Sequence, residues 1–150
     1  MLVQLLLQLP RDAASVPLAR RVLDTALASV DVTEQCRSDI GLALSEACGN
    51  VVDHAVEADR FEVKVSTEER RCVIEVVNAG DPVDRRRLLQ PMVGPEAERG
   101  RGLHIIRAVM DVAEVVAGPA GGLAIRMIKK LVFTHPDANR SIDPRAMLSE

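Results

Sequence analysis

The sequence predicts an α+β protein: a two-layer sandwich of a mainly antiparallel sheet with helices on one face. Segments with helical spacing of apolar residues and segments that alternate with period two follow the order β, α, α, β, β, short α, loop, α, β, β. Hydrophobic residues make up 47% of the 150 residues, which is enough for the core of one domain. Aromatic residues make up only 1%, so that core must be aliphatic.

The N-terminal part of the chain predicts a strand and then a helix. Residues 2–9 alternate weakly between apolar and polar side chains, and Pro10 ends the strand. Ser15 is the expected N-cap of a helix that runs to about Val30, with Pro17 in its first turn. Its expected core stripe consists of apolar residues at helical spacing: Leu18, Val22, Ala26 and Leu27.

A second, longer helix is expected from a cap at Thr33 to about Val56. At about 100° per residue, four apolar residues cluster on one side as its core stripe: Ile40, Leu44, Ala47 and Val51. Glu46, Asn50 and His54 form a polar stripe at the edge of the apolar one. This helix is therefore expected to line the wall of a cleft.

After the second helix, the sequence predicts a hairpin, loops, one more helix and two more strands. In chain order these are a strand at 61–66, a turn at 68–70, a strand at 72–77, a loop at 78–84, a short helix at about 85–89, a loop at 91–102, a helix at about 103–110, a strand at 112–116, a turn at 118–122 and a strand at 123–132. Residues 1–133 are expected to form the domain, and the polar residues 134–150 a loose tail.

The composition disfavours several classes of partner. A net charge of −3 provides no broad basic field for nucleic acid, and a chain with so few aromatic residues lacks stacking platforms for single strands. Its three cysteines have no C-x-x-C spacing, which favours reduced thiols over a disulfide framework or a zinc site. The apolar start is too short to span a bilayer and lacks a basic leader. We therefore expect a soluble, cytoplasmic protein that binds neither nucleic acid nor membrane.

Three segments contain candidate functional residues: EACGNVVDHA, VVNAGDPVD and ERGRGLHIIRAVMD. In this order and spacing they resemble the ATP-binding Bergerat fold (the GHKL superfamily) of gyrase, Hsp90, histidine kinases and MutL. Within that superfamily, the chain is most similar to the bacterial anti-sigma factors that are also serine-protein kinases. The resemblance, over residues 1–132, implies ATP and Mg²⁺ as cofactors. It also implies a sigma factor and a STAS-domain antagonist as partners, and a homodimer.

The resemblance also implies residue roles. Asn50 would be the Mg²⁺ ligand, since one amide oxygen suffices beside the phosphates and water, and Glu46 would be the base that accepts the proton of the attacking hydroxyl. Arg20 matches a residue of the partner-binding surface, with an ordinary solvated arginine as the alternative. His54 lies one turn beyond Asn50, and a purely structural histidine is equally consistent with the sequence. The implied nucleotide-binding residues are Asn50, His54, Asn78, Gly80, Arg99, Gly100, Arg101, Gly102 and Leu103.

The glycine segment 100–102 is expected to precede a helix, so that its backbone N–H groups and the helix dipole hold phosphate oxygens. Glycine also lets the backbone approach a ligand closely. The loop before it, 91–99, would be the ATP lid. On this interpretation, Glu46 and Asn50 share a pocket with the backbone of residues 100–102.

Two positions depart from the family pattern at the expected adenine pocket. Asn78 replaces an aspartate, and an amide oxygen accepts the adenine hydrogen bond without charge assistance, a loss of about 1 kcal/mol. Leu123 and Ala124 follow Gly122, where the family tends to have a threonine. Both departures are expected to weaken the polar contacts with adenine, so that nucleotide binds poorly, a different nucleotide binds, or none does.

Two functions therefore remain open. One is an anti-sigma factor with ATP-dependent serine/threonine kinase activity towards its antagonist. The other is a kinase-inactive or nucleotide-independent partner-binding module of the same fold, which the departures favour and the intact Glu46 and Asn50 oppose. The ATPase domain of a histidine kinase is disfavoured, because too few residues precede the motif helix to form a hairpin bearing the phosphorylated histidine.

Overall fold

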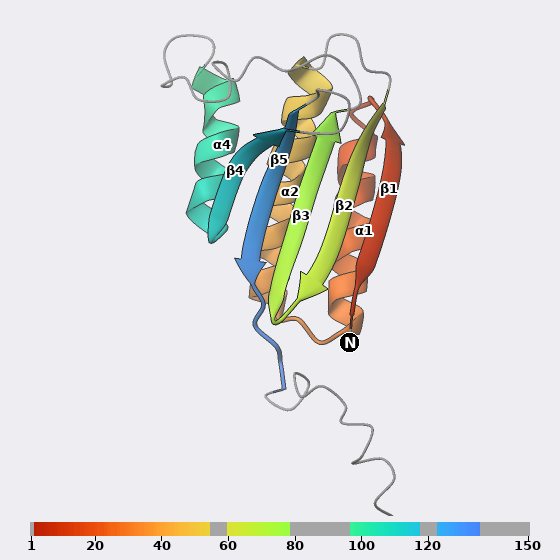
Figure 1. Ribbon diagram of the computed structural model, residues 1–150, viewed down its shortest axis with the longest axis vertical. Coiled ribbons are helices and arrows are strands. Elements are labelled where there is room, and N and C mark those ends of the chain that lie inside the picture. The colour runs from red at the N-terminus through yellow and green to blue at the C-terminus, as the bar shows by residue number, and fades with distance from the viewer. Residues whose placement is uncertain (1, 55–59, 79–96, 118–122, 136–150) are drawn as a thin grey trace, which may run out of the picture.

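A computed structural model describes residues 2–54, 60–78, 97–117 and 123–135. In this part of the chain, five strands form one antiparallel sheet in the order β1-β2-β3-β5-β4, and three helices cover one face of it (Figure 1). The predicted fold class is confirmed. The elements are β1 (Gln4–Pro10), α1 (Ser15–Ser29), α2 (Glu34–His54), β2 (Arg60–Glu68), β3 (Arg71–Asn78), α4 (Ala97–Val109), β4 (Val112–Ala117) and β5 (Leu123–Lys130).

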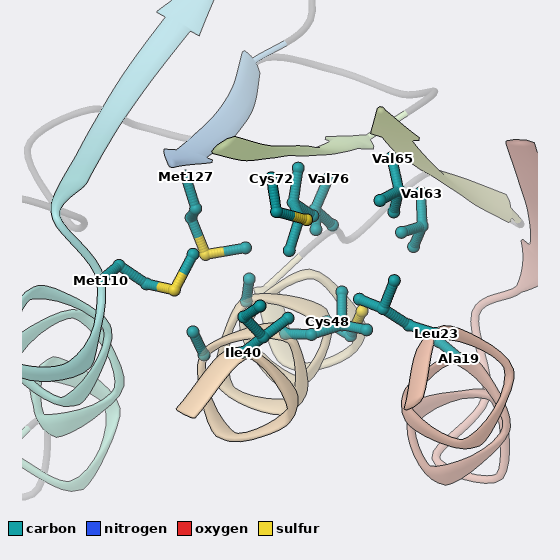
Figure 2. Packing of buried hydrophobic residues seen from close by; sticks show 14 of the residues in the cluster. Ala19, Leu23, Ile40, Cys48, Val63, Val65, Cys72, Val76, Met110 and Met127 are labelled. Carbon is teal, nitrogen blue, oxygen red and sulfur yellow. The ribbon is translucent and has the colours of Figure 1, made fainter. Parts of the chain in front are cut away.

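The core lies between the helices and the covered face of the sheet, and it is aliphatic as the composition predicts, apart from the buried Phe61. Figure 2 shows Ile40 and Cys48 of α2 pointing toward Cys72 and Val76 of β3. Met110 and Met127 close one side of this layer, where flexible thioether side chains can fill irregular space. Each fully buried aliphatic side chain contributes about 1.5–3 kcal/mol, so this layer holds the helices to the sheet.

Helix α1 differs from the prediction in its cap and in its buried side. Ser15 is the first helical residue, and its hydroxyl donates to the backbone oxygen of Pro10 at 2.7 Å instead of capping the helix. The predicted core stripe is confirmed at Leu27 but was wrong at Leu18, which is 45% exposed, and at Val22, which is only partly buried. The buried residues are Ser15, Ala19, Leu23 and Leu27. Helix α1 has apolar residues on two sides, and the side with small Ala19 lies against the sheet.

Helix α2 begins and packs as predicted. The hydroxyl of Thr33 accepts a hydrogen bond from the backbone N–H of Cys36 at 3.3 Å, which is the expected cap. All four residues of the predicted core stripe are buried: Ile40, Leu44, Ala47 and Val51. Thr33 also donates its backbone N–H to Val132 at 2.8 Å. The chain that leaves β5 is therefore fastened at the start of α2, the opposite end of the molecule from His54 (Figure 1).

Helix α4 begins at Ala97, so the loop predicted over 91–102 was wrong for its last six residues. Ala, Glu and Arg are strong helix formers, and each glycine in a helix interior costs only about 1 kcal/mol. The two glycines therefore do not prevent the helix from starting at Ala97. Leu103, Ile106 and Met110 are buried as predicted. The predicted segments 79–96 and 118–122, and the tail from 136, lie outside the described residues.

Buried thiols make the stability of the fold sensitive to alkaline pH. The three cysteines are free and buried, and burial raises the pKa of Cys48 and of Cys72 to about 12. In the unfolded chain a thiol has a pKa of about 8.5. The contribution of the protonated, buried thiols to the free energy of unfolding is therefore complete below that pH and is lost as the pH rises toward 12.

We expect the free energy of unfolding, measured by urea titration, to fall between pH 8.5 and 11 by up to about 1.4 kcal/mol per pH unit for each thiol. The double variant Cys48→Ala/Cys72→Ala should be less stable at pH 7 but should show a flatter decline. Equal slopes in the two proteins would contradict this assignment.

Candidate functional site

The second half of α2, the first half of α4 and the end of β3 lie at the same end of the molecule (Figure 1). Glu46 and Asn50 are one turn apart on α2, and both are half-buried beside the buried Ala47 and Val51. They therefore lie at the edge of the core stripe of α2. This edge is where the sequence predicts the wall of a cleft.

Gly102 of α4 is the point on which these two side chains converge. A Cβ atom added to Gly102 would lie 3.0 Å from Oε2 of Glu46, and 3.2 and 3.3 Å from Oδ1 and Nδ2 of Asn50. These distances are tighter than most Cβ contacts in proteins, so any larger residue at this position would push Glu46 and Asn50 aside by a few tenths of an ångström. A carboxylate, an amide and a bare stretch of backbone thus meet in one corner, as the motifs predict.

The position of the glycine segment within its helix differs from the prediction. Gly100 and Gly102 lie inside α4 and do not precede it. The N–H groups of a helix that lack an intrahelical partner belong to its first turn, which here begins at Ala97. The positive end of the α4 dipole therefore lies at residues 97–99, one turn before the segment in which it was expected. The side chains of Arg99 and Arg101 lie outside what the structure describes.

Gly49 marks open space beside the polar stripe. It precedes Asn50 in α2, and no described atom lies within 4 Å of a Cβ added to it. At about 100° per residue, Gly49 is within roughly 60° of Glu46 around the helix. Among the described residues, therefore, no side chain packs against this part of the α2 wall. Sequence analysis did not single out Gly49, although a glycine inside a helix is unfavourable and is a signal in itself.

The last turn of α2 is held by a residue that sequence analysis also missed. The Arg11 side chain donates from Nε to the backbone oxygen of Val52 at 2.9 Å. Such a bond satisfies a carbonyl that the helix leaves without an internal partner, and it places a cation at the negative end of the dipole. His54 is the final residue of α2, and its side chain is not among those described.

Asn78 ends β3 and is 2% exposed. Its neighbour Val77 pairs with Ala124 at the start of β5, so Asn78 and the segment Leu123–Ala124 lie next to each other in the sheet. The two departures from the family pattern therefore concern one place in the molecule. Gly80, the other residue expected there, lies outside the described residues.

Arg20 belongs to a different surface, a groove between α1 and α2. The groove has a volume of about 400 Å³, and its lining includes Arg20, Arg21, Asp24, Glu34, Arg37 and Gly41. The Arg20 side chain lies across Gly41, where an added Cβ would be 2.9 Å from Nε. Arg37 donates to Asp24 across the groove at 2.8 Å. Glu46 and Asn50 do not line this groove.

The described residues also bear on metal binding and on membrane spanning. No three His, Cys, Asp or Glu side chains in this part of the chain come together as ligands for a metal ion. None of its helices is both long and apolar enough to cross a bilayer.

The fold is that of a histidine kinase-like ATPase domain. The sequence model of the histidine kinase-like ATPase domain matches residues 9–129. The chain therefore belongs to the histidine kinase-like ATPase family, within the group of bacterial anti-sigma factors and serine-protein kinases.

Individual relatives agree with this membership. The chain is 35% identical to an anti-sigma F factor of Pasteuria penetrans over 121 residues, which is 75% of this chain and 81% of that protein. It is 30% identical to an anti-sigma F factor of Caldanaerobacter subterraneus over 74% of this chain and 82% of that protein. It is also 26% identical to the serine-protein kinase RsbW of Bacillus subtilis over 91% of each chain.

A solved structure supports the fold. The RsbU and RsbW domains of a Mycobacterium tuberculosis protein superpose on this chain with a TM-score of 0.66 at 20% identity. The match includes 86% of this chain and 32% of that longer one.

Proposed function

We propose that this protein is a cytoplasmic anti-sigma factor that also uses ATP to phosphorylate a serine or threonine of its antagonist. The observation that supports the proposal is the convergence of Glu46 and Asn50 on Gly102, which brings a carboxylate and an amide to the backbone of α4. Support also comes from similar proteins that are named anti-sigma F factor and serine-protein kinase RsbW. Phosphorylation of the antagonist would leave the sigma factor sequestered.

In this proposal each residue of the corner has one task. Glu46 accepts the proton of the attacking hydroxyl, and Asn50 contributes its side-chain oxygen to Mg²⁺. The oxygen of Asn50 fits that role, because it lies beside Gly102, in the same corner as the carboxylate of Glu46. When bound, Mg²⁺ would neutralise charge on the phosphates. The first-turn N–H groups of α4 would hold the phosphate oxygens, and Gly102 would let the α4 backbone lie close to the ligand, so most of the catalysis is positioning.

The adenine end of the site would be weaker. Asn78 would accept the bond from the adenine amino group, and Gly80 would lie beside the ring. Arg99 and Arg101 would face the phosphates, while Leu103, which is buried, would support the wall. His54 stays a candidate contact at the end of α2.

A second candidate is a partner-binding module of the same fold that has lost the kinase step. The observation in its favour is that Asn78 and the segment Leu123–Ala124 lie side by side, so two polar adenine contacts are weakened together. Phosphate transfer separates the two candidates. The chain is mixed with γ-labelled Mg–ATP and STAS-domain proteins of its own organism.

Label on one serine or threonine of one such protein is the result expected of the kinase. If no label transfers while the chain still blocks sigma-dependent transcription, the binding module is the function.

The groove between α1 and α2 yields a prediction about partner binding. Gly41→Ala should push the Arg20 side chain away, because the new Cβ would lie 2.9 Å from its Nε. We expect the affinity for sigma factor and antagonist to fall by about tenfold or more, a change of at least ~1.4 kcal/mol. Stability should not fall, since alanine favours a helix over glycine by about 1 kcal/mol.

Surface plasmon resonance with both partners measures this change. Arg20→Ala should weaken binding as much, and the double variant no further. Unchanged affinity in Gly41→Ala would show that Arg20 has no part in partner binding.

A further inference from the structure

Lys129 is a cation on the covered face of the sheet, and the proposed mechanism does not use it. It follows Ile125 and Met127 along β5 with period two, and both of those side chains belong to the core. The side chain of Lys129 is only 19% exposed. An ammonium group withdrawn from water is strongly destabilising unless it is paired and hydrogen-bonded. The partners of Lys129 therefore indicate what this residue does.

The ammonium group of Lys129 joins the end of α4 to α2. It donates to the backbone oxygen of Val109 at 2.6 Å, and it lies 3.5 Å from Oδ2 of Asp39. Val109 is the last residue of α4, so its carbonyl is one of those that the helix leaves without an internal partner. The positive charge also lies at the negative end of the α4 dipole. Three elements, β5, α4 and α2, therefore meet at one side chain.

The contact at Lys129 and the corner at Gly102 lie along the same line of contact between α2 and α4. Asp39 precedes Glu46 by seven residues on α2, and Val109 follows Gly102 by seven residues on α4. Seven residues are about two turns, so the two members of each pair lie on nearly the same side of their helix, ~10.5 Å apart along its axis. The two helices run in opposite directions (Figure 1). They are therefore held together at two matching levels, one at the corner and one at Lys129.

Other contacts of α4 define its position against α2 less closely. Asp111, two residues after the helix, donates its backbone N–H to Ile128 at 3.0 Å, and its carboxylate accepts from the backbone N–H of Lys130 at 2.6 Å. These bonds join the chain to β5 and not to α2. The buried side chains of α4 that the structure describes are apolar, and hydrophobic burial has no direction, whereas a hydrogen bond weakens steeply with a poor angle. Lys129 thus provides a directional link that reaches α2.

We propose that Lys129 is a positioning residue: its link between the C-terminal end of α4 and Asp39 of α2 sets the position in which Gly102 meets Glu46 and Asn50. The corner is sensitive to a shift of α4, since a single methyl group at Gly102 would already push both of these side chains aside. A misplacement of a reacting group by about 1 Å can reduce a rate 100-fold, even when its cause lies far from the chemistry. This effect on catalysis rests on the proposed function, whereas the link between the helices does not.

Hydrogen–deuterium exchange of the full chain tests the link without any catalysis. Lys129→Met keeps a long apolar side chain but removes the ammonium group, so amides in the second half of α4 should exchange about tenfold faster or more, while those of β2 and β3 keep the wild-type rate. Lys130→Met is the matched control, because it removes the same charge from the next residue, which is exposed. Wild-type exchange of α4 in Lys129→Met, an equal increase in Lys130→Met, or an equal increase throughout the sheet would overturn the proposal.

Phosphate transfer tests the effect of the link on the corner. Lys129→Met should lower kcat about tenfold or more, Lys129→Arg should recover part of this loss because a guanidinium also donates to a carbonyl and a carboxylate, and Lys130→Met should transfer at the wild-type rate. The effects of Lys129→Met and Gly102→Ala should not add, since both alter the approach of α4 to α2.

Additive effects of these two substitutions, or wild-type transfer by Lys129→Met, would contradict a positioning role. A wild type that transfers no phosphate would instead count against the proposed function, and the exchange of the α4 amides would then decide whether Lys129 holds α4 to α2.

Discussion

Glu46→Gln is expected to reduce phosphate transfer to the antagonist by about 10²–10⁴-fold, which is the usual contribution of a positioned general base. Glutamine keeps the shape of the side chain and its contact with Gly102, but it cannot accept the proton of the attacking hydroxyl. Mg–ATP affinity should change little, since Asn50 and the backbone of α4 remain. Single-turnover transfer of labelled phosphate, with nucleotide affinity measured in parallel, separates these two effects.

Glu68→Gln is a suitable control for this prediction, because it removes a carboxylate from an exposed site at the end of β2. It should transfer phosphate at the wild-type rate. Transfer by Glu46→Gln within a factor of a few of the wild-type rate would show that another group is the base.

Gly102→Ala is expected to lower Mg–ATP affinity by about tenfold, or ~1.4 kcal/mol, because the new Cβ displaces Asn50, the proposed Mg²⁺ ligand. The new Cβ would lie 3.0 Å from the carboxylate of Glu46 and 3.2 Å from the amide of Asn50, so both side chains must shift or α4 must move away. Alanine also favours the helix by about 1 kcal/mol, which offsets part of the clash. Isothermal titration calorimetry and urea unfolding would therefore show a large loss of binding with a small change in stability.

Gly41→Ala is the matched control, because it introduces the same methyl group at a buried helix glycine whose neighbour is Arg20. Its Mg–ATP affinity should equal that of the wild type. An unaltered affinity in Gly102→Ala would mean that the nucleotide does not use this corner.

The fold could be predicted because its layers are aliphatic and periodic. The stripe on α2 and the alternation in β2 and β3 each have one apolar side, so the buried face follows directly from the pattern. Helix α1 has two apolar sides, and periodicity does not say which one meets the sheet. The wrong choice of Leu18 over Ala19 and Leu23 follows from that ambiguity. The start of α4 was misplaced because its glycines suggested a loop.

The site could be predicted only in part, for a similar reason. Four-residue steps on a helix place Glu46 and Asn50 on one side, and this spacing is visible in the sequence. The contact of both side chains with Gly102 depends on how α2 and α4 approach each other, which no local pattern specifies. The bond from Arg11 to Val52 joins two elements in the same way. Residues whose role depends on contacts between elements, such as Arg11, gave only weak signals.

The most direct test of the site is the stability of the protein with and without Mg–nucleotide. At 100 times its dissociation constant, Mg–ATP should raise the free energy of unfolding of the wild type by about 2.7 kcal/mol. Asn50→Ala should lose this gain, because the metal ligand in the corner at Gly102 is removed. No gain in the wild type at millimolar Mg–ATP, or an equal gain in Asn50→Ala, would contradict the assignment of this corner as the nucleotide site.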